Sequence, residues 1–394
     1  MICKICKKKK IKEVLNLGLQ PLANKYPKNQ KEFTKERKFP LNLFFCSNCL
    51  NVQIKKIISR KEMFEDYYYL SSVNKGLVIH FKQLAKKIKN SSFVVDIGSN
   101  DGILLKPLKS MGVRALGVDP SVNVGKIAND NGFKTLVSFF NKDIVNKIIN
   151  QYEKPDTIIA SSVFTHIENP LLFAKNIKKL IKKNGFFILE VEYLTNFIKN
   201  IQFERFYFDR PFYYSLNSIK ILFEQVGMSL VNIDLIETHG GSIRCFIKNK
   251  KNEKSSNIVN KMLKKEREEL TNKKFKIFNE KIIKEAKKFK QKLQYYKKLK
   301  KKVIGYGAPA RVSTITNYSK INKQEITYII DDNPIKQNRF TPGVHIPIVN
   351  RKKNIDNDID VVIVFAYEYF KEIKKHTKKL KCDYFKPIPF KKLI

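Results

Sequence analysis

The stretch Val94-Val-Asp96-Ile-Gly98-Ser-Asn100-Asp-Gly102 decides the fold, because it joins an apolar run to an acidic residue and a glycine-rich turn. Such a run, turn and following helix open an α/β unit. Gly98 lets the backbone approach a ligand closely, and Gly102 lets the helix pack tightly on the strand. The stretch therefore predicts the first strand, turn and helix of a ligand-binding sheet.

An acidic residue after the next apolar run indicates the ligand. Asp119 stands about 20 residues beyond the turn, where a carboxylate can accept hydrogen bonds from two ribose hydroxyls. The spacing DxGxxxG favours S-adenosylmethionine, because the NAD fingerprint GxGxxG is absent. NAD binding and a vestigial site are the alternatives. We expect five residues to bind the methyl donor: Asp96, Gly98, Asn100, Gly102 and Asp119.

Apolar runs that alternate with amphipathic stretches surround this turn. They lie at four places, which are residues 93–97, 115–118, 157–160 and 186–189. This alternation is typical of βαβ units with a parallel sheet. A second unit begins at Lys302, with further strand-like runs at 327–330 and 361–365. We therefore expect an α/β protein with two Rossmann-like domains joined by helices.

Four of the six cysteines stand as two CxxC pairs, Cys3 with Cys6 and Cys46 with Cys49. Each CxxC turn presents two thiolates to one point, and tetrahedral Zn²⁺ takes four. In a cytosolic chain such pairs indicate a metal site before a disulfide, with a pair of redox dithiols as the alternative. Four thiolates leave no open position for water, so we expect a structural Zn²⁺ site.

Length and periodicity indicate how the chain is divided. A chain of 394 residues is long enough for two or three domains. The Lys- and Glu-rich stretch 250–300 repeats apolar residues at helical spacing, which predicts two amphipathic helices whose charges form a solvated face. We expect a zinc-binding domain, a methyltransferase domain, a helical linker and a C-terminal Rossmann-like domain, at residues 1–60, 61–250, 251–300 and 301–394.

Charge and hydropathy narrow the choice of partner. The formal net charge is +42, but Lys supplies almost all of the excess along the whole length. Recognition of bases and phosphates favours Arg, so we expect no nucleic-acid partner, while a small anionic substrate would benefit from the positive field. No apolar run approaches the roughly 20 residues of a membrane span, and no apolar segment of a secretory signal follows the first charges. We expect a cytoplasmic protein.

Further motifs offer polar groups to a ligand. His166 follows the run at 157–160, and the carboxyl ends of strands in open α/β sheets face the ligand crevice, although a lone His is more often structural. Residues 203–216 form an aromatic stretch, and His239 opens a His-Gly-Gly-Ser turn that can aim backbone N–H groups at an anion. The alternative for both segments is an ordinary loop or hairpin.

Taken in order, these motifs resemble the sugar C-methyltransferases that act on nucleotide-linked 4-keto deoxysugars. The landmarks run over essentially the whole chain: both Cys pairs, DYYY at 66–69, DIGSNDG at 96–102, VFTHI at 163–167, EVEYL at 190–194, HGGSIR at 239–244, GYGA at 305–308 and DDNPIKQNRFTPG at 331–343. The family has a four-Cys zinc domain, a class I methyltransferase domain and a second Rossmann-like domain. The resemblance implies the same architecture, S-adenosylmethionine-dependent methyl transfer and a nucleotide-sugar substrate.

The resemblance also implies where the substrate binds. In the family, the C-terminal domain helps to hold the nucleotide-sugar, so cationic residues there are expected to contact phosphate. Arg311 stands where family members usually carry Lys. From the residues alone, the turn at 305–308 with Asp331 could instead suggest a dinucleotide site. The expected substrate-binding residues are Tyr69, His239, Arg244, Arg311, Lys336 and Arg339.

The chain departs from the family at the proposed base. Relatives typically carry a Tyr-His-Glu-His run whose last His removes the proton beside the ketone, whereas this chain reads Tyr207-Phe-Asp209-Arg210. Arg cannot act as a general base near neutral pH, because its pKa exceeds about 12. We therefore expect Arg210 to contact an anionic or carbonyl oxygen. His166 is favoured to move the proton, with Asp209 and Tyr207 as the other candidates.

The main alternative for Arg210 is that it and Asp209 only pair with one another and shape the loop.

Four hypotheses describe the activity. The first is carbon methylation beside a ketone, which needs a base, stabilisation of the enolate oxygen and placement of two substrates. Methylation of oxygen or nitrogen on the same fold needs no carbanion, which suits the loss of the His. A non-catalytic binding protein is a third reading, against which the intact turn argues. Nucleic-acid methylation is a fourth, and no target-recognition repeat supports it.

Overall fold

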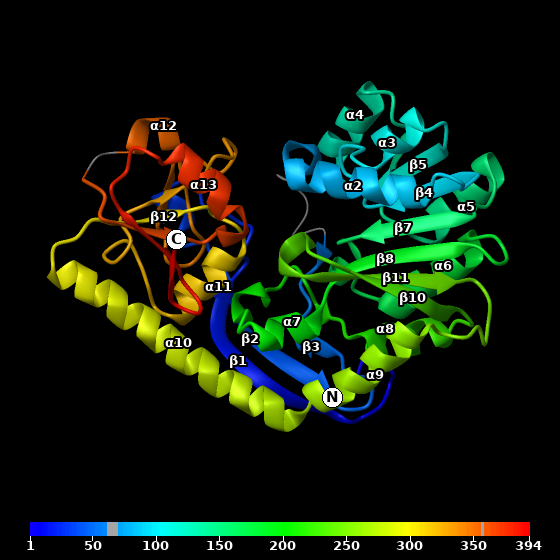
Figure 1. Cartoon of the computed structure of the whole chain (residues 1–394), viewed down its shortest axis with the longest axis horizontal. Helices are drawn as coiled ribbons and strands as arrows, with labels where there is room; N and C mark the ends of the chain where they lie inside the picture. Colours follow the sequence, from blue (N-terminus) through cyan, green and yellow to red (C-terminus); the bar gives the residue numbers. More distant parts are fainter. Residues whose placement is uncertain (61–69, 356–357) are drawn as a thin grey trace.

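The computed structural model describes residues 1–60, 70–355 and 358–394. The strands within these ranges form one four-stranded and two seven-stranded sheets. Figure 1 shows the two larger sheets beside one another, with the long strand β1 (Ile11–Pro21) and the long helix α10 (Asn272–Lys298) passing below and between them. No helix in the described part of the chain is long and apolar enough to cross a bilayer.

The first sheet has the strand order β1-β2-β3-β9. Its first two strands form a long antiparallel ribbon, which pairs Ile11 with Cys46 at one end and Pro21 with Lys38 at the other. Its fourth strand comes from much later in the chain and pairs Tyr213 with Val52. The sheet therefore extends beyond the segment 1–60 that the cysteine pairs mark. The strand bounds are β1 Ile11–Pro21, β2 Lys38–Cys46, β3 Val52–Ile54 and β9 Phe212–Tyr213.

The second sheet has the order β10-β11-β8-β7-β4-β5-β6, with β11 antiparallel to both neighbours and the strands from β8 to β6 parallel. Its four predicted runs are the strands β4, β5, β7 and β8. The bounds are β4 Phe93–Ile97, β5 Arg114–Asp119, β6 Thr135–Val137, β7 Thr157–Ser161, β8 Phe186–Glu192, β10 Ser229–Ile236 and β11 Ser242–Lys248. The α/β class and the methyltransferase-type domain are thus confirmed.

Helices cover both faces of this sheet because the central strands carry apolar side chains on both faces. Along β4, Val95 packs toward α5, α6 and α8, whereas Val94 packs toward α2 and α3. The helices are α2 Lys75–Lys87, α3 Leu105–Ser110, α4 Val122–Asp130, α5 Lys142–Tyr152, α6 Pro170–Leu180, α7 Leu194–Lys199 and α8 Leu216–Glu224. Short 3₁₀ turns lie at η2 Ser71–Val73, η3 Phe164–His166, η4 Phe203–Arg205 and η5 Thr238–Gly240, and η1 Gln30–Glu32 lies in the first domain.

The third sheet has the order β14-β15-β13-β12-β16-β17-β18, with β13, β12, β16 and β17 parallel where they pair. Its strands are β12 Val303–Tyr306, β13 Ile329–Ile330, β14 Arg339–Phe340, β15 Pro347–Val349, β16 Val361–Val364, β17 Asp383–Lys386 and β18 Lys391–Leu393. Its helical segments are α11 Arg311–Tyr318, α12 Arg351–Asn354, η6 Tyr367–Tyr369 and α13 Phe370–His376.

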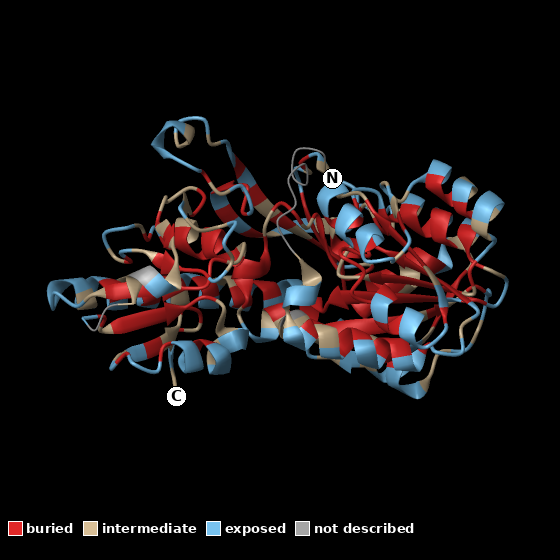
Figure 2. Ribbon diagram, turned by 90° about the horizontal axis from the view of Figure 1, so that it is seen from above, coloured by how far each residue is buried: buried red, intermediate tan, exposed pale blue. Residues whose placement is uncertain are grey.

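The predicted helical pair is α9 Asn257–Glu269 and α10 Asn272–Lys298. The apolar face of α10 is buried in a core that also holds residues of β1, β2 and α11. Figure 2 shows buried residues filling the strands of the larger sheets, while exposed residues lie on the outer faces of the helices. Helix α10 therefore ties the ribbon to the C-terminal sheet as well as linking two domains in sequence.

Candidate active site and metal centre

The four predicted zinc ligands lie together at one end of the β1–β2 ribbon. Their sulfur atoms all lie within 4.8 Å of one another. Sγ of Cys3 is 3.5 Å from that of Cys49, and Sγ of Cys6 is 3.6 Å from that of Cys46. Four thiolates at about 2.3 Å from a tetrahedral Zn²⁺ would lie about 3.8 Å apart. The cluster therefore fits a structural Zn²⁺ held by Cys3, Cys6, Cys46 and Cys49.

The glycine-rich turn after β4 has the backbone that its sequence predicts. Gly98, Asn100 and Gly102 all have positive φ, at 76°, 51° and 83°. A Cβ on Gly98 would lie 2.9 Å from the Val163 side chain, and one on Gly102 would lie 2.7 Å from Phe133. Glycine is thus required at both positions by the backbone and by the packing.

Two buried carboxyl groups flank this turn. Burial, followed by the charges of Asp119 and Glu190, raises the pKa of Asp96 to about 8. Asp119, at the end of β5, accepts N–H bonds of 2.9 Å from Asn100 and from Ser121. Burial raises the pKa of Asp119, and these two backbone bonds oppose the shift. Each of its oxygens keeps a second lone pair, so the carboxylate can also accept ribose hydroxyls. These residues fit the methyl donor.

A segment that sequence reasoning did not identify lies against the turn. The backbone N–H of Ser71 donates to Oδ1 of Asn100 over 2.9 Å. Ser72 donates to Oδ2 of Asp101 from its N–H over 3.1 Å and from its hydroxyl over 2.6 Å. Segment η2 is therefore anchored on the donor turn just before α2 begins.

Arg244, predicted to bind substrate, lies in a buried polar network. It is 4% exposed, and its Nε lies 2.6 Å from Oε1 of Glu190. Oε2 of Glu190 accepts from His80 at 2.9 Å and from Ser161 at 2.5 Å. Burial alone would raise the pKa of Glu190, but the bond and charge of His80, then the charge of Arg244, bring it to about 2. The structure thus gives the Arg244 guanidinium protein partners.

The predicted catalytic residues come together at the carboxyl ends of β7 and β8. Nδ1 of His166 lies 2.6 Å from the backbone oxygen of Asp209. A carbonyl oxygen only accepts, so this bond places the hydrogen on Nδ1 and the ring lone pair on Nε2. Burial, then the charge of Arg210, lowers the pKa of His166 to about 4. The imidazole is therefore neutral near pH 7.

Arg210 has a partner that sequence reasoning missed. Its guanidinium pairs with Glu192 at the end of β8, and the two side chains are 11% and 1% exposed. The guanidinium carbon also lies 5.1 Å from the centre of the Tyr207 ring. Burial alone would lower the pKa of Arg210, but Glu192 and the neighbouring acidic groups raise it above its usual value. The cluster thus holds a permanent cation whose position is fixed by a buried carboxylate.

Asp209 is 3% exposed, and its carboxylate is bound by the first domain rather than by Arg210. Its Oδ2 accepts from Nδ2 of Asn24 over 2.5 Å. Burial raises the pKa of Asp209, while the Asn24 bond opposes that shift. Burial also raises the pKa of the Tyr207 phenol. A raised pKa makes the Asp209 carboxylate a stronger base than usual and keeps the Tyr207 phenol protonated near pH 7, so His166 and Asp209 both stay candidates for proton transfer.

Of the predicted phosphate contacts, Arg311 and Lys336 lie at the turn after β12, whereas Arg339 lies in β14. Arg311 and Arg205 both pair with Glu368, the latter over 2.5 Å. Nζ of Lys336 donates to the carbonyl of Ala308 over 2.9 Å. Nε of Arg339 donates to the Ile335 carbonyl over 2.9 Å.

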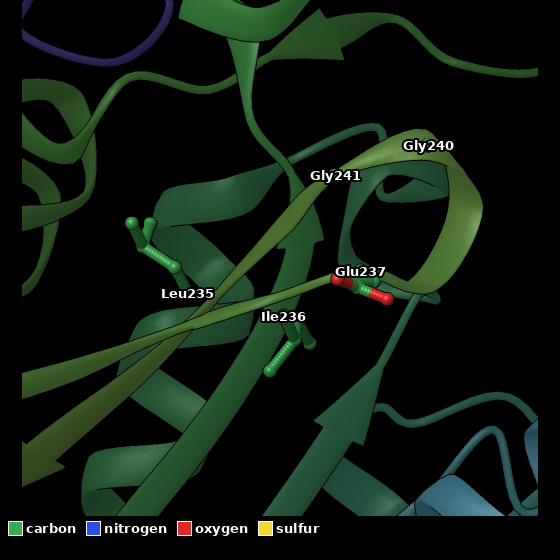
Figure 3. Close-up of a pocket in the computed structure, with 5 residues that line it drawn as sticks. All are labelled: Leu235, Ile236, Glu237, Gly240 and Gly241. Carbon is green, nitrogen blue, oxygen red and sulfur yellow. The ribbon is translucent and has the colours of Figure 1, made fainter.

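Two of the expected substrate contacts have no described side chain. Tyr69 lies outside the described residues, and only the backbone of His239 is described, within η5. The glycine turn that follows it joins β10 to β11 and borders a pocket of about 400 Å³ (Figure 3). The pocket is lined by Leu235, Ile236, Glu237, Gly240 and Gly241. Because β10 and β5 stand on opposite sides of the central strands, this pocket is distinct from the donor turn.

Comparison with known proteins covers nearly the whole chain in three parts. Residues 3–64 match a family model described as "Putative zinc binding domain", residues 70–233 match "Methyltransferase domain", and residues 237–389 match "C-methyltransferase C-terminal domain".

Individual relatives match over different lengths. The C-methyltransferase NovU of Streptomyces niveus is 26% identical over 389 residues, which is 96% of this chain and 92% of that protein. A ubiquinone biosynthesis O-methyltransferase of Bradyrhizobium diazoefficiens is 28% identical over 24% of this chain and 38% of its own length. Among solved structures, magnesium protoporphyrin IX methyltransferase of Synechocystis PCC 6803 with bound SAM covers 49% of this chain and 99% of its own, at 15% identity and a TM-score of 0.37.

Proposed function

We propose that this S-adenosylmethionine-dependent C-methyltransferase, which has an N-terminal zinc-binding domain, acts on a nucleotide-linked 4-keto deoxysugar. The observation that carries the proposal is the cluster of His166, Arg210 and Glu192, which combines a neutral imidazole with a fixed cation. A base can take the proton beside a ketone, and a fixed cation can stabilise the enolate oxygen that forms. The motif order that resembles sugar C-methyltransferases supports the choice of a sugar.

The donor side of the site is formed by the β4 turn and Asp119. The turn brings backbone N–H groups to the carboxyl edge of the sheet, and the Asp119 carboxylate would accept the ribose hydroxyls. When bound there, S-adenosylmethionine supplies an electrophilic methyl group.

The acceptor side follows from the hydrogen position on His166. With Nδ1–H directed at the Asp209 carbonyl, Nε2 is the nitrogen that would take the proton from the carbon beside the ketone. The electron pair of that C–H bond moves into the enolate, whose oxygen Arg210 would stabilise. The Glu192 carboxylate keeps the guanidinium in place while this charge develops.

The phosphate-binding part of the proposal lies in the C-terminal domain. Arg311 and Lys336 stand near the turn after β12, together with Arg205 from the methyltransferase domain. Their carboxylate and carbonyl partners fix the cationic groups in position, and a diphosphate would exchange for or add to those partners.

Mass spectrometry of reactions with S-adenosylmethionine and a panel of nucleotide-linked keto sugars tests this function. We expect a gain of one methyl group and, without donor, exchange of solvent deuterium into the carbon beside the ketone. Methyl gain without that exchange would point to an oxygen or nitrogen acceptor and contradict the proposal. An absence of methyl gain across all the keto sugars would contradict it as well.

The roles within the cluster are tested by substitution. His166→Asn should lower turnover by about 10²–10⁴-fold while S-adenosylhomocysteine binding is kept. Arg210→Lys keeps the charge but loses the planar fork, so turnover should also fall. His376→Asn is the matched control, because this exposed imidazole lies on α13. Wild-type turnover by His166→Asn would remove His166 from proton transfer.

A further inference from the structure

The β1–β2 ribbon extends from the cysteine cluster of the zinc-binding domain toward the C-terminal domain. Strand β1 has 11 residues, and at about 3.3 Å per residue it spans roughly 36 Å. Cys46 lies opposite Ile11 at the zinc end, while the segment after Pro21 lies at the opposite end. Figure 1 shows this strand running from the region near the N-terminus toward the C-terminal sheet. The ribbon therefore has a tip, residues 22–37, that lies away from the metal cluster.

This tip is docked on the C-terminal domain. The Tyr26 hydroxyl donates to the carbonyl of Ala308 over 2.8 Å, and the N–H of Phe340 donates to the carbonyl of Pro27 over 2.9 Å. Both carboxylate oxygens of Glu36 lie 2.9 Å from the N–H of Gly343. These bonds join backbone to backbone and side chain to backbone, so they fix the tip in place.

From this position one side chain of the tip reaches the methyltransferase domain. Nδ2 of Asn24 donates to the buried Asp209 carboxylate over 2.5 Å. The backbone carbonyl of the same Asp209 accepts from Nδ1 of His166 over 2.6 Å. Two hydrogen bonds through one residue thus connect the zinc-binding domain to the imidazole at the centre of the site.

We propose that Asn24 is a positioning residue of the transferase centre: it holds Asp209, and through the Asp209 carbonyl it orients the His166 ring. The zinc-binding domain then completes a site that belongs to another domain. The catalytic part of this inference rests on the proposed function, whereas the contact itself does not.

The physical basis is the cost of burying a carboxylate. A buried charge that loses a hydrogen-bond donor either takes up a proton or moves toward another partner. Either response would shift the Asp209 backbone, whose carbonyl is the acceptor for His166. Asn24 itself is exposed, so its substitution creates no cavity and the fold should persist.

Steady-state kinetics of the full chain, with zinc bound, test the proposal. Asn24→Ala should lower kcat about tenfold or more at unchanged KM for both substrates, in a chain that is still folded. Asn24→Asp should be worse, because it places a second carboxylate beside Asp209, and Asn24→Gln should recover part of the loss. The matched control is Asn42→Ala, which removes an amide that donates to Glu13 over 3.0 Å elsewhere on the same ribbon.

A readout without substrate separates this inference from the proposed function. Nitrogen NMR of the His166 ring should show Nδ1 protonated in the wild type and in Asn42→Ala, and this state should be lost or exchange-broadened in Asn24→Ala. If the wild type transfers no methyl group, the proposed function fails while this spectrum still reports the contact. An unchanged His166 signal and kcat in Asn24→Ala would overturn the inference, as would a rise in acceptor KM with kcat unchanged.

Discussion

Each of the two Rossmann-like domains places an aspartate carboxylate beside its glycine turn. Asp119 is the last residue of β5, and Asp331 directly follows β13; each of these strands neighbours the strand that leads into the glycine turn of its domain. Each carboxylate accepts an N–H from that turn, from Asn100 at 2.9 Å and from Ala308 at 2.6 Å. Each carboxylate also accepts an N–H from the residue two positions after it, from Ser121 at 2.9 Å and from Asn333 at 2.8 Å.

The turns themselves differ. The first has three residues with positive φ, whereas at the second Gly307 is the one such residue between 303 and 319. A Cβ on Gly307 would lie 2.4 Å from that of Ala366, and the carbonyl of Ala308 accepts from both Lys336 and Tyr26. A glycine turn followed by an acid therefore predicts a backbone shape, while neighbouring side chains decide whether a ligand or the protein itself occupies it.

Removal of zinc should have the largest effect and should reach both turns, because the cysteines share a buried apolar core with β4 and the ribbon that begins at them carries Tyr26 to the second turn. Four-thiolate sites contribute on the order of 10 kcal/mol to folding, so chelation or Cys46→Ser should lower the melting temperature strongly. Metal analysis should find about one Zn²⁺ per chain, and metal-free protein from a chelator-free purification would contradict this prediction.

The two turns should differ in how they make stability depend on pH. Asp96 stands two residues before Gly98 in the first turn, whereas the uncharged Gly305 stands two residues before Gly307 in the second. The pKa of Asp96 is raised from 3.8 to about 8 by burial and by Asp119 and Glu190. The native state therefore binds one more proton than the unfolded state between about pH 4 and 8, and the wild type loses stability as pH rises through that window. Denaturation without ligand should show that the free energy of unfolding of Asp96→Asn rises relative to that of the wild type as pH increases through this range, and that the difference is constant above it. A constant difference across the window would contradict the shift.

Matched substitutions of the two aspartates test the comparison most directly. Asp119→Ala should weaken S-adenosylhomocysteine binding by about 1.5–3 kcal/mol for each charge-assisted bond lost. Asp331→Ala should leave that affinity unchanged, because its carboxylate serves Ala308 and the following loop. Calorimetry measures both, and equal binding by wild type and Asp119→Ala would exclude Asp119 from the donor site.

The fold was largely predictable because its signals are local. Strand β4 has the predicted bounds, since its side chains alternate between two apolar layers. Strand β13 is shorter than the run at 327–330, because only Ile329 and Ile330 find ladder partners. The cysteine pairs and the glycine turn were found because each motif places its chemistry within a few residues.

The parts of the site that were missed depend on residues distant in sequence. Asn24 and Asp209 are 185 positions apart, and no local pattern marks either as the partner of the other. Arg210 was expected to contact substrate or to pair with Asp209, and the fold adds Glu192 at the end of β8, which no local pattern marks as its partner. A sequence shows that a charge is present, and only the fold shows which counter-charge lies beside it.

Strand β9 has a consequence for synthesis of the chain. In the first sheet, the edge of β3 that faces away from β2 pairs with Phe212 and Tyr213 of β9, and the Ser215 hydroxyl donates to the Cys49 carbonyl over 3.2 Å. A ribosome must therefore release more than half of the chain before the first sheet can close. Until then the edge of β3 is unpaired, and an unpaired edge is where strands of other chains can add. The first sheet thus stays open until part of the second domain has been made.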